Sequence, residues 1–166
     1  MQSVSINNLT FDEYLSQQEI ATIVAQVAKR INADYAGREP LFICVLNGAF
    51  MYASDLFKLI TLPAEITFVR LKSYEGTATT GKVNMLIPLQ TSVKDRDVII
   101  IEDIVDTGTT LKHLKAYLMD RNPKCVKICT LLDKPSRRVA DIKADYIGFE
   151  IDNLFVVGYG LDYDHK

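Results

Sequence analysis

Apolar residues in this sequence follow two different patterns. Between Ile20 and Ile31 they recur every three or four positions, directly after the capping-box pattern of Ser16 and Glu19, and this spacing predicts a helix over about 17–32. Elsewhere, short apolar and β-branched runs bounded by polar or turn residues are typical of strands. Such runs predict strands at 41–46, 65–71, 83–88, 98–101, 126–132, 146–149 and 155–157.

Helices are expected after two of these strands. The turn at 47–48 leads into a helix that ends near residue 60, and apolar residues at helical spacing over 111–118 lie in a helix that ends near residue 120. Strands that alternate with helices predict an α/β fold with a central, mostly parallel sheet flanked by helices. The length of 166 residues favours a single domain, 1–166. We expect its core over about 17–132 and a small C-terminal hood over about 133–166, joined by N-terminal residues; the strands at 146–149 and 155–157 are assigned to this hood.

One segment has almost nothing to bury. Residues 72–82, KSYEGTATTGK, contain two glycines and three threonines between two predicted strands. Such a composition indicates a mobile surface loop. Its length suggests a lid.

Charge and length exclude several classes of protein. The chain has 19 basic and 21 acidic residues and a sequence pI of about 5.7, which does not favour a nucleic-acid surface. The N-terminus lacks a basic segment followed by an apolar one, and no stretch approaches the roughly 18 apolar residues that a membrane span requires. We therefore expect a cytoplasmic protein without a membrane partner.

The cysteines are not arranged like a metal site. Cys44, Cys125 and Cys129 all lie inside apolar runs, and the only histidines are His113 and His165. An odd number of cysteines in apolar runs indicates buried, reduced thiols rather than a zinc site.

Candidate chemistry gathers over residues 98–110, VIIIEDIVDTGTT. Small side chains, hydroxyl groups and backbone N–H groups at the start of a helix suit a phosphate dianion. Glu102 and Asp103 cannot bind a phosphate directly, so they imply a ligand that also carries hydroxyl groups or a metal ion. A sugar phosphate meets both conditions. The phosphate-binding candidates are Asp106, Thr107, Gly108, Thr109 and Thr110; from the pattern alone, Asp106 could equally be a helix N-cap.

This segment resembles the 5-phosphoribosyl-1-pyrophosphate signature of type I phosphoribosyltransferases, and most closely that of the hypoxanthine-guanine branch. Further matching segments follow in the family's order: LNGA from Leu46, LKSY from Leu71, DKPSRR from Asp133 and FEIDNLFVVGYGLDY from Phe149. The resemblance implies the type I phosphoribosyltransferase fold. It also implies a catalytic role for Asp106, which would exchange a proton with purine N7.

The resemblance assigns the remaining sugar and phosphate contacts. Glu102 and Asp103 would bind the ribose hydroxyls and, with Asp162, would contact Mg2+ as the cofactor. Backbone groups of the loop at 46–48 would hold pyrophosphate, for which the candidates are Leu46, Asn47, Gly48 and Arg138. The family often has Lys or Arg where Asn47 stands, so pyrophosphate binding here would depend more on the main chain and on Mg2+.

The purine contacts and the lid are implied in the same way. Lys134 can donate but not accept a hydrogen bond, which favours a 6-oxo purine. Phe155 would stack on the base, and the Val156 main chain would contact its edge. The purine-binding candidates are Lys134, Phe155, Val156 and Asp162, and the lid candidates are Ser73 and Tyr74. Closing the lid would exclude water from the reaction.

The expected activity is transfer of a phosphoribosyl group from 5-phosphoribosyl-1-pyrophosphate to hypoxanthine, with guanine as a further base, in purine salvage. One alternative is a related transferase that prefers xanthine. A second is a nucleotide-sensing, RNA-binding regulator, and a third is a generic nucleotide-binding module. The family usually forms homodimers or homotetramers. The family also carries an Arg that contacts pyrophosphate beyond the position of Lys166, which leaves two alternatives: this sequence is a truncated version, or the family's pyrophosphate clamp is incomplete in it.

Overall fold

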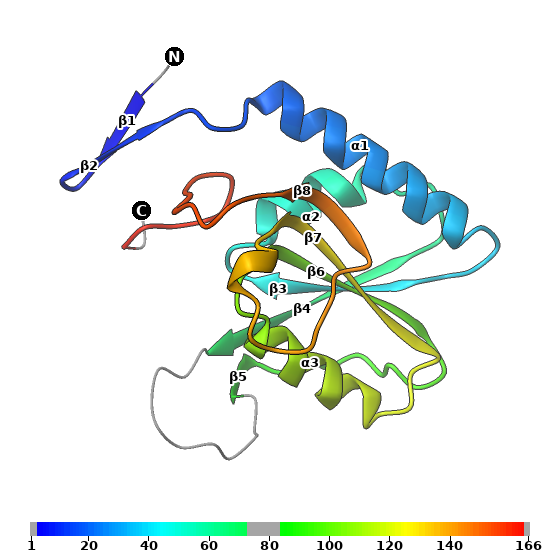
Figure 1. The fold of residues 1–166 in the computed structure, drawn as a ribbon. Coiled ribbons are helices and arrows are strands. Elements are labelled where there is room, and N and C mark those ends of the chain that lie inside the picture. The colour runs from blue at the N-terminus through cyan, green and yellow to red at the C-terminus, as the bar shows by residue number, and fades with distance from the viewer. Residues whose placement is uncertain (1–2, 73–83, 165–166) are drawn as a thin grey trace.

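A computed structural model describes residues 3–72 and 84–164 of the chain. Its centre is a six-stranded sheet in the order β5-β4-β3-β6-β7-β8, with helices on both faces (Figure 1). Every neighbouring pair is parallel except β4 with β5. The strands are β3 (Leu41–Leu46), β4 (Glu65–Lys72), β5 (Asn84–Ile87), β6 (Asp97–Val105), β7 (Cys125–Asp133) and β8 (Tyr146–Glu150). The predicted α/β fold with a mostly parallel sheet is confirmed.

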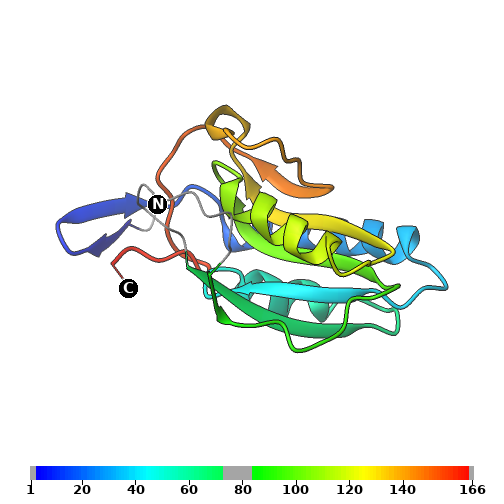
Figure 2. The same ribbon diagram turned by 90° about the horizontal axis from the view of Figure 1, so that it is seen from below.

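The two faces of the sheet form separate apolar clusters. Helices α1 (Gln17–Asp34) and α2 (Phe50–Phe57) cover one face, and α3 (Thr109–Met119) covers the other (Figures 1 and 2). Because side chains alternate along a strand, Ile99 and Ile101 of β6 pack with α1 and α2, whereas Val98 and Ile100 pack with α3. All four are fully buried. This double burial explains the uninterrupted apolar run in the sequence.

Hydrogen bonds at the helix ends explain where α1 begins and α2 ends. Glu19 N donates to Ser16 Oγ at 3.3 Å and Ser16 N donates to Glu19 Oε2 at 2.8 Å, so the predicted capping box is confirmed. The predicted end of α2 near residue 60 is wrong, because α2 ends at Phe57. Asn32 of α1 donates to Leu59 O at 2.9 Å and accepts from Thr61 N at 3.0 Å. These bonds satisfy backbone groups beyond the helix and hold the chain in a turn.

The C-terminal segment differs from the prediction in two ways. The strand predicted at 146–149 is present as β8, but it pairs with β7 in the main sheet rather than lying in a separate hood. The strand predicted at 155–157 is absent. Within 151–164 the only strand-like pairing is the bridge between Gly158 and Leu161. The apolar residues at 155–157 line a cavity instead of pairing with a strand.

A hairpin at the N-terminus was not predicted. Strands β1 (Ser3–Ile6) and β2 (Leu9–Asp12) pair through a turn in which Asn7 has a φ of 53°. Asn tolerates this left-handed conformation better than most residues, so the Asn-Asn pair was the missed signal. The hairpin stands beside the C-terminal segment (Figures 1 and 2), and Asn7 Nδ2 donates to Asp164 Oδ2 at 3.2 Å.

The three cysteines lie in the interior as free thiols, as the sequence predicted. Cys44 and Cys129 are buried, Cys125 is half-buried, and all three are free thiols. Burial raises the pKa of the Cys44 and Cys129 thiols to about 12, which keeps them protonated. In the described ranges, no helix combines the length and apolarity that a membrane crossing would need.

Candidate active site

The candidate residues gather at one edge of the sheet, where β3, β6 and β7 end. These strands run parallel, so the loops that follow them lie next to one another. Ligands of open α/β sheets bind at this carboxyl edge. Strand β6 continues to Val105, beyond the predicted end at Ile101, because its pairing with β7 continues through Ile104 with Leu132. Glu102 and Asp103 are therefore part of the strand rather than of the loop after it.

The loop after β6 leads into α3 with the geometry of an anion site. Gly108 is the N-cap residue and has a φ of 81°, a left-handed conformation that favours glycine. Thr109 N donates to Thr107 Oγ1 at 3.5 Å, and the two threonine hydroxyls lie 3.4 Å apart. Hydroxyl groups and helix N–H groups thus gather at one point, as phosphate binding requires.

Asp106 is not the helix N-cap, so that alternative is wrong. Its side chain is 42% exposed, and its Oδ1 accepts a hydrogen bond from Arg137 Nε at 3.0 Å. Arg137 comes from the short 3-10 helix η1 (Pro135–Arg137) that follows β7. The Asp106 carboxylate is thus held by the side chain of Arg137, which follows β7, and not by the backbone of α3.

Glu102 and Asp103 are adjacent acids, of which Glu102 is buried and Asp103 is half-buried. Asp103 N donates to Glu102 Oε1 at 3.2 Å, and Ile104 N donates to Asp103 Oδ1 at 2.7 Å. Burial raises the pKa of Glu102 well above its usual range, and the Asp103 charge adds to the effect. Burial also raises the pKa of Asp103, and part of the increase comes from the charge of Asp162. In residues 3–72 and 84–164, neither acid of the pair has an ion-pair partner.

This chemistry fits a hard divalent cation bound jointly with a substrate. Carboxylate oxygens without a cationic partner are suitable Mg2+ ligands, and Mg2+ commonly combines one or two protein carboxylates with substrate oxygens and water. Among the described residues, no group of three or more His, Cys, Asp or Glu side chains could hold a metal alone. Glu102, Asp103 and Asp162 therefore do not form a closed metal site without further ligands.

The loop after β3 lies directly against the acid pair. A Cβ atom at Gly48 would overlap Asp103 Oδ2, and a Cβ atom at Gly160 would overlap the Gly48 carbonyl oxygen. The Leu46–Asn47 peptide bond is cis. The structure thus brings three predicted segments together: the loop at 46–48, the acid pair and the C-terminal turn before Asp162.

Arg138 lies apart from this loop. Its side chain is only 15% exposed, and it forms an ion pair with Asp133. It also donates from Nε to Asp106 O at 3.1 Å and from Nη1 to Ile142 O at 2.8 Å. In the described part of the chain, no hydrogen bond or ion pair joins its side chain to Leu46, Asn47 or Gly48. The structure therefore places the Arg138 side chain against the phosphate loop, next to Asp106 and Gly108.

The purine candidates lie in two places. A cavity of about 750 Å³ is lined by four of the predicted residues, together with mainly apolar neighbours from the N-terminal hairpin and α1. The four are Asn47, Phe155, Val156 and Asp162. Lys134 is buried at the end of β7, where its N–H donates to Val105 O at 2.9 Å, and it does not line this cavity.

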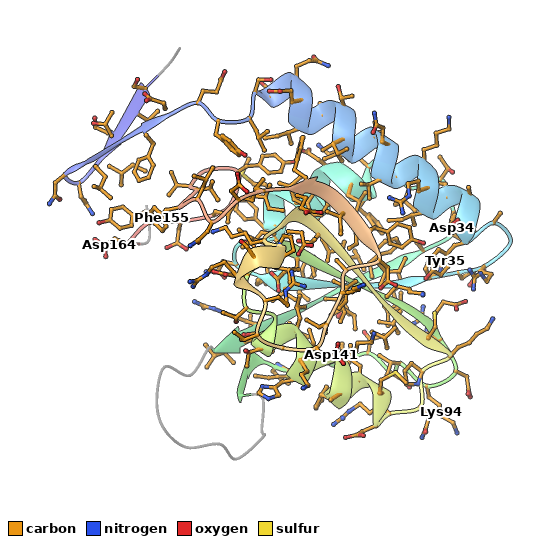
Figure 3. All side chains as sticks on the ribbon, viewed as in Figure 1. Asp34, Tyr35, Lys94, Asp141, Phe155 and Asp164 are labelled. Atoms are coloured by element: carbon orange, nitrogen blue, oxygen red, sulfur yellow. The ribbon has the colours of Figure 1, made fainter. Side chains whose placement is uncertain are left out.

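Contacts from distant segments hold the cavity together. Tyr159 OH donates to Asp55 Oδ2 at 2.6 Å, which ties the C-terminal segment to α2. Phe155 is 63% exposed, and its ring centroid lies 6.1 Å from that of Phe11 and 5.7 Å from that of Tyr163. Figure 3 shows Phe155 on the side of the molecule that faces the N-terminal hairpin.

Sequence reasoning missed Arg137, Phe11, Tyr159 and Tyr163. Arg137 stood inside the quoted DKPSRR segment, which was the available signal, but Phe11 lies far from every matching motif. The lid candidates Ser73 and Tyr74 lie outside the described residues.

Fold and site together are typical of an α/β enzyme with a candidate phosphate loop beside a pair of acids, Glu102 and Asp103. Residues 10–164 match the model of the phosphoribosyl transferase domain family. The chain therefore belongs to the phosphoribosyltransferase family, and the resemblance to its hypoxanthine-guanine branch is confirmed by relatives and solved structures.

Several curated relatives carry the name hypoxanthine-guanine phosphoribosyltransferase, and two of them illustrate the similarity. The protein from Bacillus subtilis is 46% identical over 153 residues, which are 92% of this chain and 85% of that protein. The protein from Streptococcus thermophilus is 45% identical over 152 residues, 91% of this chain and 84% of that protein. A crystal structure of a hypoxanthine-guanine phosphoribosyltransferase from Bacillus anthracis is similar with a TM-score of 0.88 and 40% identity, covering 94% of this chain and 90% of that one.

Proposed function

We propose that this protein is a hypoxanthine-guanine phosphoribosyltransferase of purine salvage. It transfers the 5-phosphoribosyl group of 5-phosphoribosyl-1-pyrophosphate to N9 of hypoxanthine or guanine, giving IMP or GMP and pyrophosphate. The observation that carries the proposal is the position of buried Glu102 and half-buried Asp103 between the phosphate loop and Gly48. One ligand with a phosphate, ribose hydroxyls and a pyrophosphate would meet all three groups.

Binding at both ends would position the reacting carbon. The loop from Asp106 to Thr110 binds the 5′-phosphate, Glu102 and Asp103 accept hydrogen bonds from the ribose hydroxyls, and the backbone of 46–48 donates to pyrophosphate. C1′ then lies between the leaving group and the base, and such orientation supplies several kcal/mol of rate acceleration. When bound at Glu102, Asp103 and Asp162, Mg2+ supplies positive charge that neutralises the pyrophosphate.

The base would bind between the C-terminal end of β7 and the C-terminal segment of the chain. Lys134 donates to the 6-oxo group, Phe155 stacks on the ring, and Asp162 and the Val156 main chain contact its edge. The N9–C1′ bond forms as the bond from C1′ to pyrophosphate breaks, and the imidazole ring loses one proton. Asp106 accepts that proton at N7 and can release it to water, because its carboxylate is 42% exposed.

Three further features complete the proposal. By the family resemblance, Ser73 and Tyr74, which lie outside the described residues, would exclude water from the reaction. The protein acts in the cytoplasm, where free thiols such as Cys44, Cys125 and Cys129 stay reduced. It forms a homodimer or homotetramer, as the family resemblance implies, and light scattering would measure this oligomeric state.

A panel of bases tests the proposed activity. The protein is incubated with Mg2+, the phosphoribosyl donor and hypoxanthine, guanine, xanthine or adenine in turn, and pyrophosphate release and nucleotide mass are measured. Turnover with hypoxanthine and guanine supports the proposal, and omitting Mg2+ tests the cofactor. Preference for xanthine would replace the proposed substrate. Salt-dependent RNA binding without transfer to any base would favour the regulator instead.

A further inference from the structure

The phosphate loop rests on the segment that follows β7. Three successive carbonyl groups of the loop, from Val105 to Thr107, accept hydrogen bonds from this segment. Val105 O accepts from Lys134 N at 2.9 Å, and Thr107 O accepts from Val139 N at 3.1 Å and Ala140 N at 3.0 Å. The central carbonyl, Asp106 O, accepts from the side chain of Arg138 through Nε at 3.1 Å.

The Arg138 guanidinium joins all parts of this support. Besides Asp106 O, it donates from Nη2 to Val105 O at 3.5 Å and from Nη1 to Ile142 O at 2.8 Å. Nη2 also pairs with the buried carboxylate of Asp133 at the end of β7. Each nitrogen of the guanidinium thus has a protein acceptor, and the group links β6, β7 and the 138–142 segment.

The side chain of Arg138 also passes close under the turn of the loop. A Cβ atom at Gly108 would lie 2.9 Å from Arg138 Cδ and 2.5 Å from Ile142 Cγ2. Only glycine fits this approach without displacing a neighbour. The position of the helix start is therefore set by the packing beneath it as well as by the left-handed backbone of Gly108.

Holding the carbonyls in this way directs the amides. In a trans peptide, C=O and the following N–H point in opposite directions. When the carbonyls of residues 105–107 point to the supporting segment, the N–H groups of Asp106, Thr107 and Gly108 point away from it. Successive N–H groups on one side of a turn form an anion-binding concavity, which the loop can present without rearranging.

We propose that Arg138 is a positioning residue that orders the loop for the 5′-phosphate, and that it is not a pyrophosphate ligand. This inference rests on the proposed function, because it takes the Asp106–Thr110 loop as the 5′-phosphate site. Asp133 has a supporting part, since its carboxylate fixes the far side of the guanidinium. The pyrophosphate role expected for Arg138 from the sequence is replaced by an indirect role at the opposite end of the donor.

Two ligands separate these roles. Ribose 5-phosphate reports on the 5′-phosphate loop, and pyrophosphate with Mg2+ reports on the other end of the donor. Their affinities are measured by calorimetry for the wild-type protein, Arg138→Gln, Arg138→Lys and Asp133→Asn. Arg121→Gln is the matched control, because Arg121 also donates to a backbone carbonyl, Tyr117 O at 2.6 Å, but is exposed and follows the C-terminal end of α3.

Arg138→Gln is expected to weaken the affinity for ribose 5-phosphate by at least about tenfold and to leave the affinity for pyrophosphate within about twofold of the wild-type value. Arg138→Lys should recover only part of the affinity, since an ammonium cannot reach several carbonyls in one plane. In turnover, KM for the donor should rise more than kcat falls. Asp133→Asn keeps the arginine and should shift the same affinity in the same direction, which tests the inference even where Arg138→Gln folds poorly.

Other outcomes are equally informative. Loss of pyrophosphate affinity alone would overturn the inference and restore Arg138 as a ligand, and unchanged affinities for both probes in all three variants would also overturn it. Those results leave the proposed function intact as long as the wild-type protein binds ribose 5-phosphate and transfers the phosphoribosyl group. If the wild-type protein does neither, the proposed function itself is wrong.

Discussion

Arg137 Nε donates to Asp106 Oδ1 at 3.0 Å. The carboxylate proposed to exchange a proton with the purine is thus held by the guanidinium of a residue in the segment that follows β7. The bond involves one oxygen of the carboxylate. Both side chains are between 42% and 46% exposed, so water screens the pair strongly. The contact is therefore suited to fixing the direction of the carboxylate more than to stabilising the fold.

Replacing Asp106 by Asn should lower turnover much more than donor binding. An amide cannot accept the imidazole proton, and loss of general base catalysis typically costs about 10²–10⁴ in rate. The KM for the phosphoribosyl donor should change little, because the backbone of the phosphate loop is retained. Steady-state kinetics with hypoxanthine measure both quantities. Unchanged turnover would remove Asp106 from the mechanism.

Replacing Arg137 by Gln should have a much smaller effect. An exposed ion pair contributes about 0–1 kcal/mol, which corresponds to no more than about a fivefold loss of kcat. The loss should shrink as salt is added, because the wild-type pair is screened as well. Kinetics at low and high salt, beside Asp106→Asn, provide the comparison. A loss as large as that of Asp106→Asn would mean that Arg137 itself touches the substrate.

Replacing Glu102 by Gln should raise the melting temperature at pH 8 and abolish transfer. Burial raises the pKa of Glu102 in the folded protein above the value of about 4.3 for an exposed glutamate. The folded state then holds the Glu102 proton more tightly than the unfolded state does. The contribution of protonated Glu102 to the free energy of unfolding is therefore fully present below about pH 4 and is lost as the pH rises toward the raised pKa. The gain of the variant should therefore be absent near pH 4.

Thermal unfolding followed by circular dichroism at both pH values measures this difference, with the exposed residue Glu39 changed to Gln as the control. An equal change of melting temperature at pH 4 and pH 8 would contradict the assignment, because it would show an effect of packing instead of charge.

Replacing Gly48 by Ala should damage catalysis, because the added Cβ would overlap Asp103 Oδ2 and displace that carboxylate. Gly37 offers a matched control. It has a φ of +75° and open space around it, so Gly37→Ala should cost about 1–2 kcal/mol of stability through backbone strain alone. Donor KM and melting temperature are measured for both variants. Normal kinetics in Gly48→Ala would show that Asp103 need not keep its position.

The parts of the fold and site that the sequence predicted depend on local signals. The run at 98–101, the Gly-Thr turn at 107–110 and the capping box at Ser16 are each encoded by neighbouring residues. The site contacts that were missed join segments far apart in the sequence. Asp106 meets Arg137 across 31 positions, and Phe11 meets Phe155 through a hairpin that no motif marked.

Arg138 illustrates the same limit for the role of a residue. Its sequence position follows the family pattern, but its burial and its acceptors are set by how β6 and β7 end side by side. The apolar run at 155–157 was misinterpreted for a related reason. Periodicity shows that these side chains are sheltered, and it does not distinguish a strand in a sheet from an irregular chain that lines a cavity.

Phe11 is expected to control purine affinity from outside the matching motifs. Its ring lies 6.1 Å from Phe155 and 6.2 Å from Tyr163, so it supports the ring proposed to stack on the base. An aromatic pair contributes about 0.5–1.5 kcal/mol, and Phe11→Leu should raise KM for hypoxanthine by about two- to tenfold while KM for the donor stays constant. Leu9→Ala, an exposed change in the same hairpin, is the control. Kinetics with each substrate varied in turn decide the matter: a parallel rise of both KM values would indicate that the hairpin supports the whole domain and not the purine site.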